Sequence, residues 1–100
     1  MSLFARIRDL AEVHKQDFAN AYAEAGGDHV KAKRLLRAKL RDSYGMDPAT
    51  IFILLQLAIR IYIWASENGY LSKRNHYIPT QVPMAGLLET MALEGDLDDE

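Results

Sequence analysis

Six cations lie close together in the first half of the chain, and their spacing suits a binding function better than any other pattern in the sequence. They are Lys31, Lys33, Arg34, Arg37, Lys39 and Arg41, with no acidic residue among them. Four of these recur three or four residues apart and therefore share a helix face. We call this set the basic patch: Lys31, Arg34, Arg37 and Arg41. Such a face can meet phosphates, anionic lipid or an acidic protein surface, although a solvated helix surface has the same pattern.

The remaining chemically active side chains do not form a catalytic or metal-binding pattern. The chain has no cysteine, which excludes thiolate ligands and cysteine nucleophiles. His14, His29 and His76 share no metal-ligand spacing. His14 falls in an apolar stripe, where a hydrogen-bonded structural histidine is expected, and Asp28 is better placed to cap a helix than to orient His29 as a base. We therefore expect no cofactor, no metal ion and no enzymatic activity.

The elements that position these residues are predicted to be four helices, which makes the fold class all-α. Apolar residues recur every three or four positions from Leu3 to Ala25, and Gly26-Gly27 ends that helix. Asp28 then caps a second helix that reaches about Tyr44. Its predicted buried side consists of Val30, Ala32, Leu35, Leu36, Leu40 and Tyr44. These two helices are expected to form a long hairpin.

The third predicted helix, residues 49–65, is apolar on nearly every side. Asp47-Pro48 is a strong helix start, and only Thr50, Gln56 and Arg60 interrupt the apolar surface. Seventeen residues span about 25 Å against a hydrocarbon core of about 30 Å, and Arg60 lies well inside the segment. The sequence therefore favours a central core helix, with a membrane-associated helix as an alternative.

The last third of the chain is predicted to hold a long loop, a short helix and an acidic tail. The loop, residues 71–82, carries the polar cluster Lys73, Arg74, His76 and Tyr77. Pro83 can open a fourth helix whose apolar stripe is Met84, Leu87, Leu88 and Met91. We expect a single helical domain over residues 1–93 and an acidic tail over residues 94–100.

The distribution of charge and of apolar surface along the chain favours contact with other subunits. The net charge is −2, yet the chain is basic in its first half and acidic at its end. Because the short fourth helix cannot cover the third one fully, we expect part of its apolar surface to form an interface with another subunit. The predicted interface residues are Ile51, Phe52, Leu55, Ile59 and Tyr62.

The leading hypothesis is a non-catalytic structural or adaptor subunit that self-associates or docks on other proteins. The basic second helix and the acidic tail would pair head to tail on neighbouring copies, giving a ring or shell. A virion or phage-particle component is the concrete setting we expect, by analogy alone. The N-terminus lacks a secretion signal, so we expect a protein of the cytoplasm or of a virus particle.

The first alternative is a regulator that contacts the nucleic-acid backbone through the basic patch. It would have little sequence preference, because the third helix offers almost no polar side chain for base edges. The second alternative is a small membrane-associated helical protein.

Overall fold

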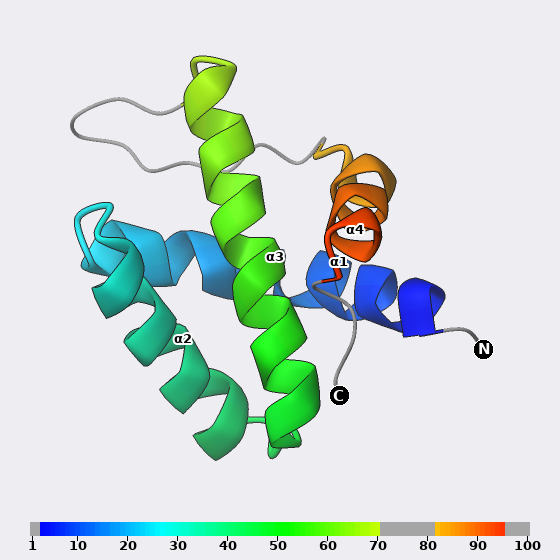
Figure 1. The fold of residues 1–100 in the computed structure, drawn as a ribbon. Helices are drawn as coiled ribbons and strands as arrows, with labels where there is room; N and C mark the ends of the chain where they lie inside the picture. The colour runs from blue at the N-terminus through cyan, green and yellow to red at the C-terminus, as the bar shows by residue number, and fades with distance from the viewer. Residues whose placement is uncertain (1–2, 71–81, 96–100) are drawn as a thin grey trace.

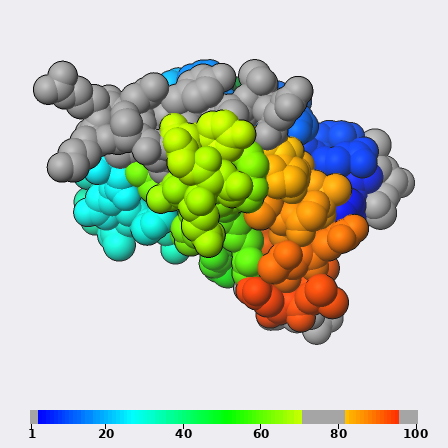
Figure 2. All heavy atoms as spheres, turned by 90° about the horizontal axis from the view of Figure 1, so that it is seen from above, coloured from blue at the N-terminus to red at the C-terminus, as the bar shows by residue number. Residues whose placement is uncertain are grey.

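Four helices pack into one small bundle in the computed structural model, which describes residues 3–70 and 82–95. They are α1 (Leu3–Glu24), α2 (His29–Asp42), α3 (Pro48–Glu67) and α4 (Met84–Leu93), and no strand occurs in the described residues. In Figure 1, α3 lies across α1 with α2 on one side and α4 on the other. Figure 2 shows the C-terminal end of α3 between α4 and the start of α2. The predicted all-α, four-helix fold is confirmed.

The helix boundaries follow from side-chain caps and glycine turns, largely as predicted. One Asp28 carboxylate oxygen accepts from the backbone N–H groups of Val30 and Lys31, at 2.9 and 3.1 Å. Asp47 accepts from the backbone N–H of Thr50 at 3.1 Å, and Pro48 occupies the first helical position, where no N–H donor is required. The α1–α2 turn uses Gly26 at φ 64°, a conformation that glycine adopts without steric cost.

The central helix α3 is longer than the predicted helix over residues 49–65. Its 20 residues reach about 30 Å, so the prediction that it is too short to cross a membrane is wrong. Among the described helices it alone meets the length and composition of a membrane span, a test that core helices also pass. Half of its most apolar window is buried inside the fold, and it packs against α1, α2 and α4. This burial supports the core-helix interpretation.

The core is formed where the apolar sides of the four helices converge around α3. Its largest fully buried members are Ile7, Phe18, Tyr22, Leu36, Leu40, Leu54, Leu55, Leu57, Ile61, Leu88 and Met91. Two residues expected in the core of α2 are instead exposed. Val30 is 68% exposed because it lies two positions before the buried Ala32, on the opposite side of the helix. Tyr44 is 46% exposed because it follows the end of α2 and contacts His14 at the surface.

Candidate functional site

One side of α3 carries an apolar surface that no described helix covers (Figure 1). We call it the α3 stripe: Phe52, Gln56, Ile59 and Ile63. Phe52 is 51% exposed and Ile63 is 42% exposed, whereas Gln56 and Ile59 are partly exposed. These residues are separated by four, three and four positions, which places them on one line along the helix. The stripe is therefore a continuous surface about three turns long.

The opposite side of α3 is held against α1 by buried packing. Leu54 and Ile61 are both 0% exposed, and each lies roughly half a helical turn around the axis from Phe52. Because α2 and α4 pack on the two remaining sides without touching each other in the described residues, three sides of α3 are occupied. The α3 stripe is the fourth side.

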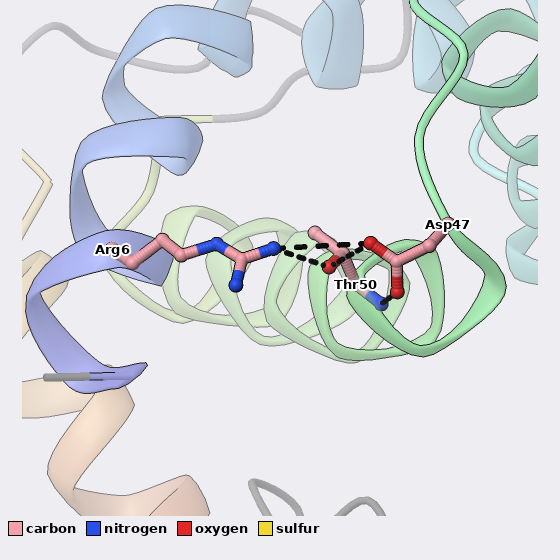
Figure 3. Close-up of polar contacts among 3 residues, drawn as sticks. All are labelled: Arg6, Asp47 and Thr50. Carbon is pink, nitrogen blue, oxygen red and sulfur yellow. Dashed lines mark hydrogen bonds and ion pairs between the residues drawn. The ribbon is translucent and has the colours of Figure 1, made fainter.

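A polar network fixes the start of α3 on α1 (Figure 3). Arg6 donates to the Thr50 hydroxyl oxygen at 3.0 Å, and that hydroxyl donates to Asp47 at 2.7 Å. Arg6 also lies 3.8 Å from the same Asp47 carboxylate oxygen. Hydrogen bonds from the Thr50 hydroxyl and the Thr50 backbone N–H hold the pKa of Asp47 below its ordinary value of 3.8. Sequence reasoning identified the Asp47 cap but missed Arg6, whose partner is distant in sequence.

Between the α3 stripe and α2 lies a hollow that is lined by apolar side chains of α3 and by arginines of α2. This hollow of about 420 Å³ is lined by Arg37, Arg41, Met46, Pro48, Ile51, Phe52 and Leu55. A second hollow of about 230 Å³ continues along α2 and is lined by Val30, Lys33, Arg34 and Arg37. Arg37 borders both hollows, so cations run beside the stripe for most of the length of α2.

The basic patch predicted from the sequence is present as one exposed region, but its members are not equivalent. Arg41 donates to Asp42 at 2.8 Å, and this hydrogen bond holds the pKa of Asp42 below its ordinary value of 3.8. Within the described residues, Lys31, Arg34 and Arg37 take part in no ion pair. Their charges are available to an external anionic partner.

The side of the stripe next to α4 carries charges of both signs. A hollow of about 200 Å³ is lined by Arg60, Ile63, Trp64, Glu67 and Leu87. Glu94, just after α4, forms an ion pair with Arg60, and α4 itself contains no Lys or Arg. The predicted acidic tail continues from Glu94, and its last five residues, 96–100, lie outside the described residues. In the described residues this flank therefore carries Arg60 beside Glu67 and Glu94, whereas the hollows on the α2 flank are lined by cations without an acid.

The structure changes the set of residues that can form an interface on α3. Of the five predicted, Phe52 is well exposed and Ile59 partly exposed. Ile51 and Leu55 are buried, at 5% and 2% exposure. The Tyr62 ring stacks on Tyr22 at 4.0 Å. Tyr62 is nevertheless partly exposed, as Ile59 is. The expectation that Ile51 and Leu55 are open to a partner is wrong, because both side chains are buried in the core.

Gln56 and Ile63 join the candidate surface in place of the buried residues, and sequence reasoning did not select them. Their spacing from Phe52 was visible in the sequence. However, α3 is apolar all round, so several stripes of equal quality can be drawn on it. The packing of α2 decides which stripe stays open.

The histidines within the described residues have structural partners. His14 is 6% exposed, with its Nδ1 atom 3.1 Å from Asp17, and the Tyr44 hydroxyl donates to the same carboxylate oxygen at 2.9 Å. The hydrogen-bonded environment predicted for His14 is therefore confirmed. The Nδ1 atom of His29 lies 2.7 Å from the Tyr22 hydroxyl oxygen.

Among the described residues, no group of three or more histidine or acidic side chains is placed to hold a metal ion. The predicted loop cluster of Lys73, Arg74, His76 and Tyr77 lies outside the described residues. The α3 stripe and its two charged flanks thus form the candidate functional surface.

Comparisons with family models, with curated proteins and with solved structures give no match to this chain. The surface combines an open apolar helix face with a basic flank on α2 and a flank of mixed charge beside α4.

Proposed function

We propose that this chain is a non-catalytic structural subunit that associates with a second copy of itself through the α3 stripe. The observation that carries the proposal is the half-exposed Phe52, in line with Ile59 and Ile63, on a helix whose other sides are covered. Scattered exposed apolar residues are ordinary, whereas an aligned apolar face on the central helix is typical of a contact surface. The virus-particle setting stays a prediction from the sequence.

A second α3 stripe is a suitable partner for this surface. Spacings of four, three and four residues are those by which two helices interlock their side chains along a seam. The single polar member, Gln56, can hydrogen-bond across such a seam, as buried polar residues do in helix pairs of fixed register. The α2 flank beside the seam is basic, with Lys33, Arg34 and Arg37 lining its hollow.

The test is the solution mass by light scattering coupled to size exclusion. We expect the wild-type chain to have twice the monomer mass of 11.3 kDa at micromolar concentration. Phe52→Ser should shift it to monomer, because the change removes the largest apolar side chain of the stripe. Val13→Ser is the matched control, since Val13 is 73% exposed on α1, away from the stripe. A wild-type monomer at every concentration would contradict the proposal.

Nucleic-acid backbone binding is the second candidate function, favoured by Lys31, Arg34 and Arg37, which form no ion pair with another described residue. It predicts that binding to a duplex of arbitrary sequence weakens steeply with salt, and that Arg34→Glu with Arg37→Glu abolishes it. Fluorescence anisotropy of labelled duplex at two salt concentrations measures both effects. Absence of binding at low salt would exclude this candidate.

A further inference from the structure

We infer that the hollow between α2 and the start of α3 binds an amphiphilic anion, a small molecule with one apolar chain and one anionic head group. We call this site the α2–α3 hollow. The apolar chain lies against α3, and the head group meets Arg37 of α2. The inference goes beyond self-association and does not rest on it, because the α2–α3 hollow shares only Phe52 with the α3 stripe.

The apolar part of the α2–α3 hollow is formed by the first two turns of α3 and by the connection before it. Ile51 and Leu55, 5% and 2% exposed, are core residues whose outer surface forms its base. Phe52, which is 51% exposed, and the half-buried Met46 give it open apolar surface. Its volume of about 420 Å³ falls in the range of small-molecule sites in proteins, about 300–1,000 Å³. An alkyl chain bound here is removed from water together with part of Phe52.

The charged part of the lining is positive. Arg37 and Arg41 border the α2–α3 hollow, and no acidic residue of the described chain lines it. The acids nearest along the chain are bonded elsewhere, since Asp42 accepts from Arg41 at 2.8 Å and Asp47 accepts from Thr50 at 3.1 Å. Arg37 forms no ion pair with another described residue. A carboxylate is the complementary head group, because a guanidinium group can bind it through two parallel hydrogen bonds.

Arg37 also determines which way the ligand lies. It borders the α2–α3 hollow and the second hollow along α2, where Lys33 and Arg34 add two further cations. At the other rim position, Arg41 already donates to a neighbouring carboxylate. The head group is therefore best placed at Arg37, with the apolar chain pointing toward Met46 and the start of α3.

A protein helix fits this lining less well than a single-chain ligand. Helices that dock in grooves insert apolar anchors at positions i, i+3, i+4 and i+7, so they need apolar surface over about two helical turns. The continuation of the α2–α3 hollow along α2 is instead lined by three cations and by Val30. One apolar chain with one anionic head matches an apolar hollow with a cation at its edge.

Decanoate is the probe, and isothermal titration calorimetry of the full chain measures its binding. We expect one decanoate per chain, with an affinity that rises roughly 3-fold for each methylene added from hexanoate to decanoate. The neutral 1-decanol, which has the same chain length, should bind on the order of 10-fold more weakly, because it offers Arg37 no charge. Absence of decanoate binding, or equal affinity for hexanoate and decanoate, would overturn the inference.

Arg37→Gln tests the assignment of the head group. It should weaken decanoate binding on the order of 10-fold and leave 1-decanol binding unchanged, because only the anionic ligand loses a partner. Lys31→Gln is the matched control, since it removes the same charge from an exposed position of α2 that lines neither hollow. An equal loss in the two variants would show that net charge alone attracts the ligand and would overturn the role of Arg37.

Amide chemical shifts of the isotope-labelled chain locate the ligand and separate this inference from the proposed function. Decanoate should shift the amide signals of Ile51, Phe52 and Leu55. Shifts centred on Ile59 and Ile63 would place the alkyl chain on the α3 stripe and overturn the site. Self-association is judged independently by the solution mass, so a dimer that binds no decanoate, or a monomer that binds it, shows which of the two proposals fails.

Discussion

The two opposite sides of α3 have similar amino-acid compositions but different surroundings. Leu54 and Ile61 are each 0% exposed, whereas Phe52 and Ile63, each two residues away from one of them, are 51% and 42% exposed. The apolar character of a residue in this helix therefore does not reveal whether it stabilises the monomer or is available to a partner. What distinguishes the two sides is whether a described helix packs against them.

The largest loss of stability is expected from a substitution on the buried side of α3. Leu57→Ala should lower the free energy of unfolding by about 2–5 kcal/mol, since it removes a fully buried side chain and leaves a cavity. Ile63→Ala should change the stability of the monomer by less than about 0.5 kcal/mol, because Ile63 is already 42% exposed. Urea unfolding below the dimer dissociation concentration measures both. Equal losses in the two variants would show that the stripe belongs to the core.

A smaller loss of stability is expected from removing the cap at the start of α2. Asp28→Ala removes the acceptor of two backbone hydrogen bonds at the start of α2 and should cost about 1 kcal/mol. For a domain of this size, the melting temperature should fall by about 4–8 °C. Circular dichroism melting measures the shift. Asp28→Asn is the conservative control, because asparagine is an equally good cap, and its melting temperature should stay near that of the wild type.

The smallest expected effect appears only at high pH and comes from Tyr22 of α1, whose ring stacks on Tyr62 of α3. Burial, together with the neighbouring Tyr62, raises the pKa of Tyr22 well above its ordinary value of 10.0. The folded state then keeps Tyr22 protonated while the unfolded chain ionises. The stability due to this group is present below pH 10 and lost as the pH rises further.

Tyr22→Phe should therefore reduce the fall in stability above pH 10, while Tyr70→Phe, at an exposed position, serves as the matched control. Urea unfolding at a series of pH values gives the two profiles. A fall of the same size in Tyr22→Phe and in the wild type would show that Tyr22 does not contribute.

The helices could be predicted from the sequence because their signals are local. Asp28, Asp47 and the glycines after α1 mark boundaries within a few residues of the cap or turn they form. The open side of α3 could not be predicted, because it depends on where α2 packs. The same reason explains why Arg6 was missed, since its contact with Thr50 joins residues 44 positions apart.

The basic patch could be predicted from the sequence, whereas the exposed residues of α3 could be predicted only in part. Charges on an exposed helix follow its periodicity, so Lys31, Arg34 and Arg37 could be grouped from spacing alone. On a helix that is apolar all round, interface residues and core residues are of the same type, so spacing alone does not separate them. Phe52 and Ile59 were therefore predicted together with Ile51 and Leu55, which the structure buries.

The most direct test of self-association through α3 is sedimentation equilibrium of the wild-type chain beside Gln56→Leu over a micromolar concentration range. Gln56 is the one polar member of the stripe, so replacing it with leucine should tighten the dimer by roughly 10-fold, a gain that misfolding cannot produce. A wild-type dimer with tighter association of Gln56→Leu is the predicted result. A mass of 11.3 kDa for both proteins at every concentration would contradict the account.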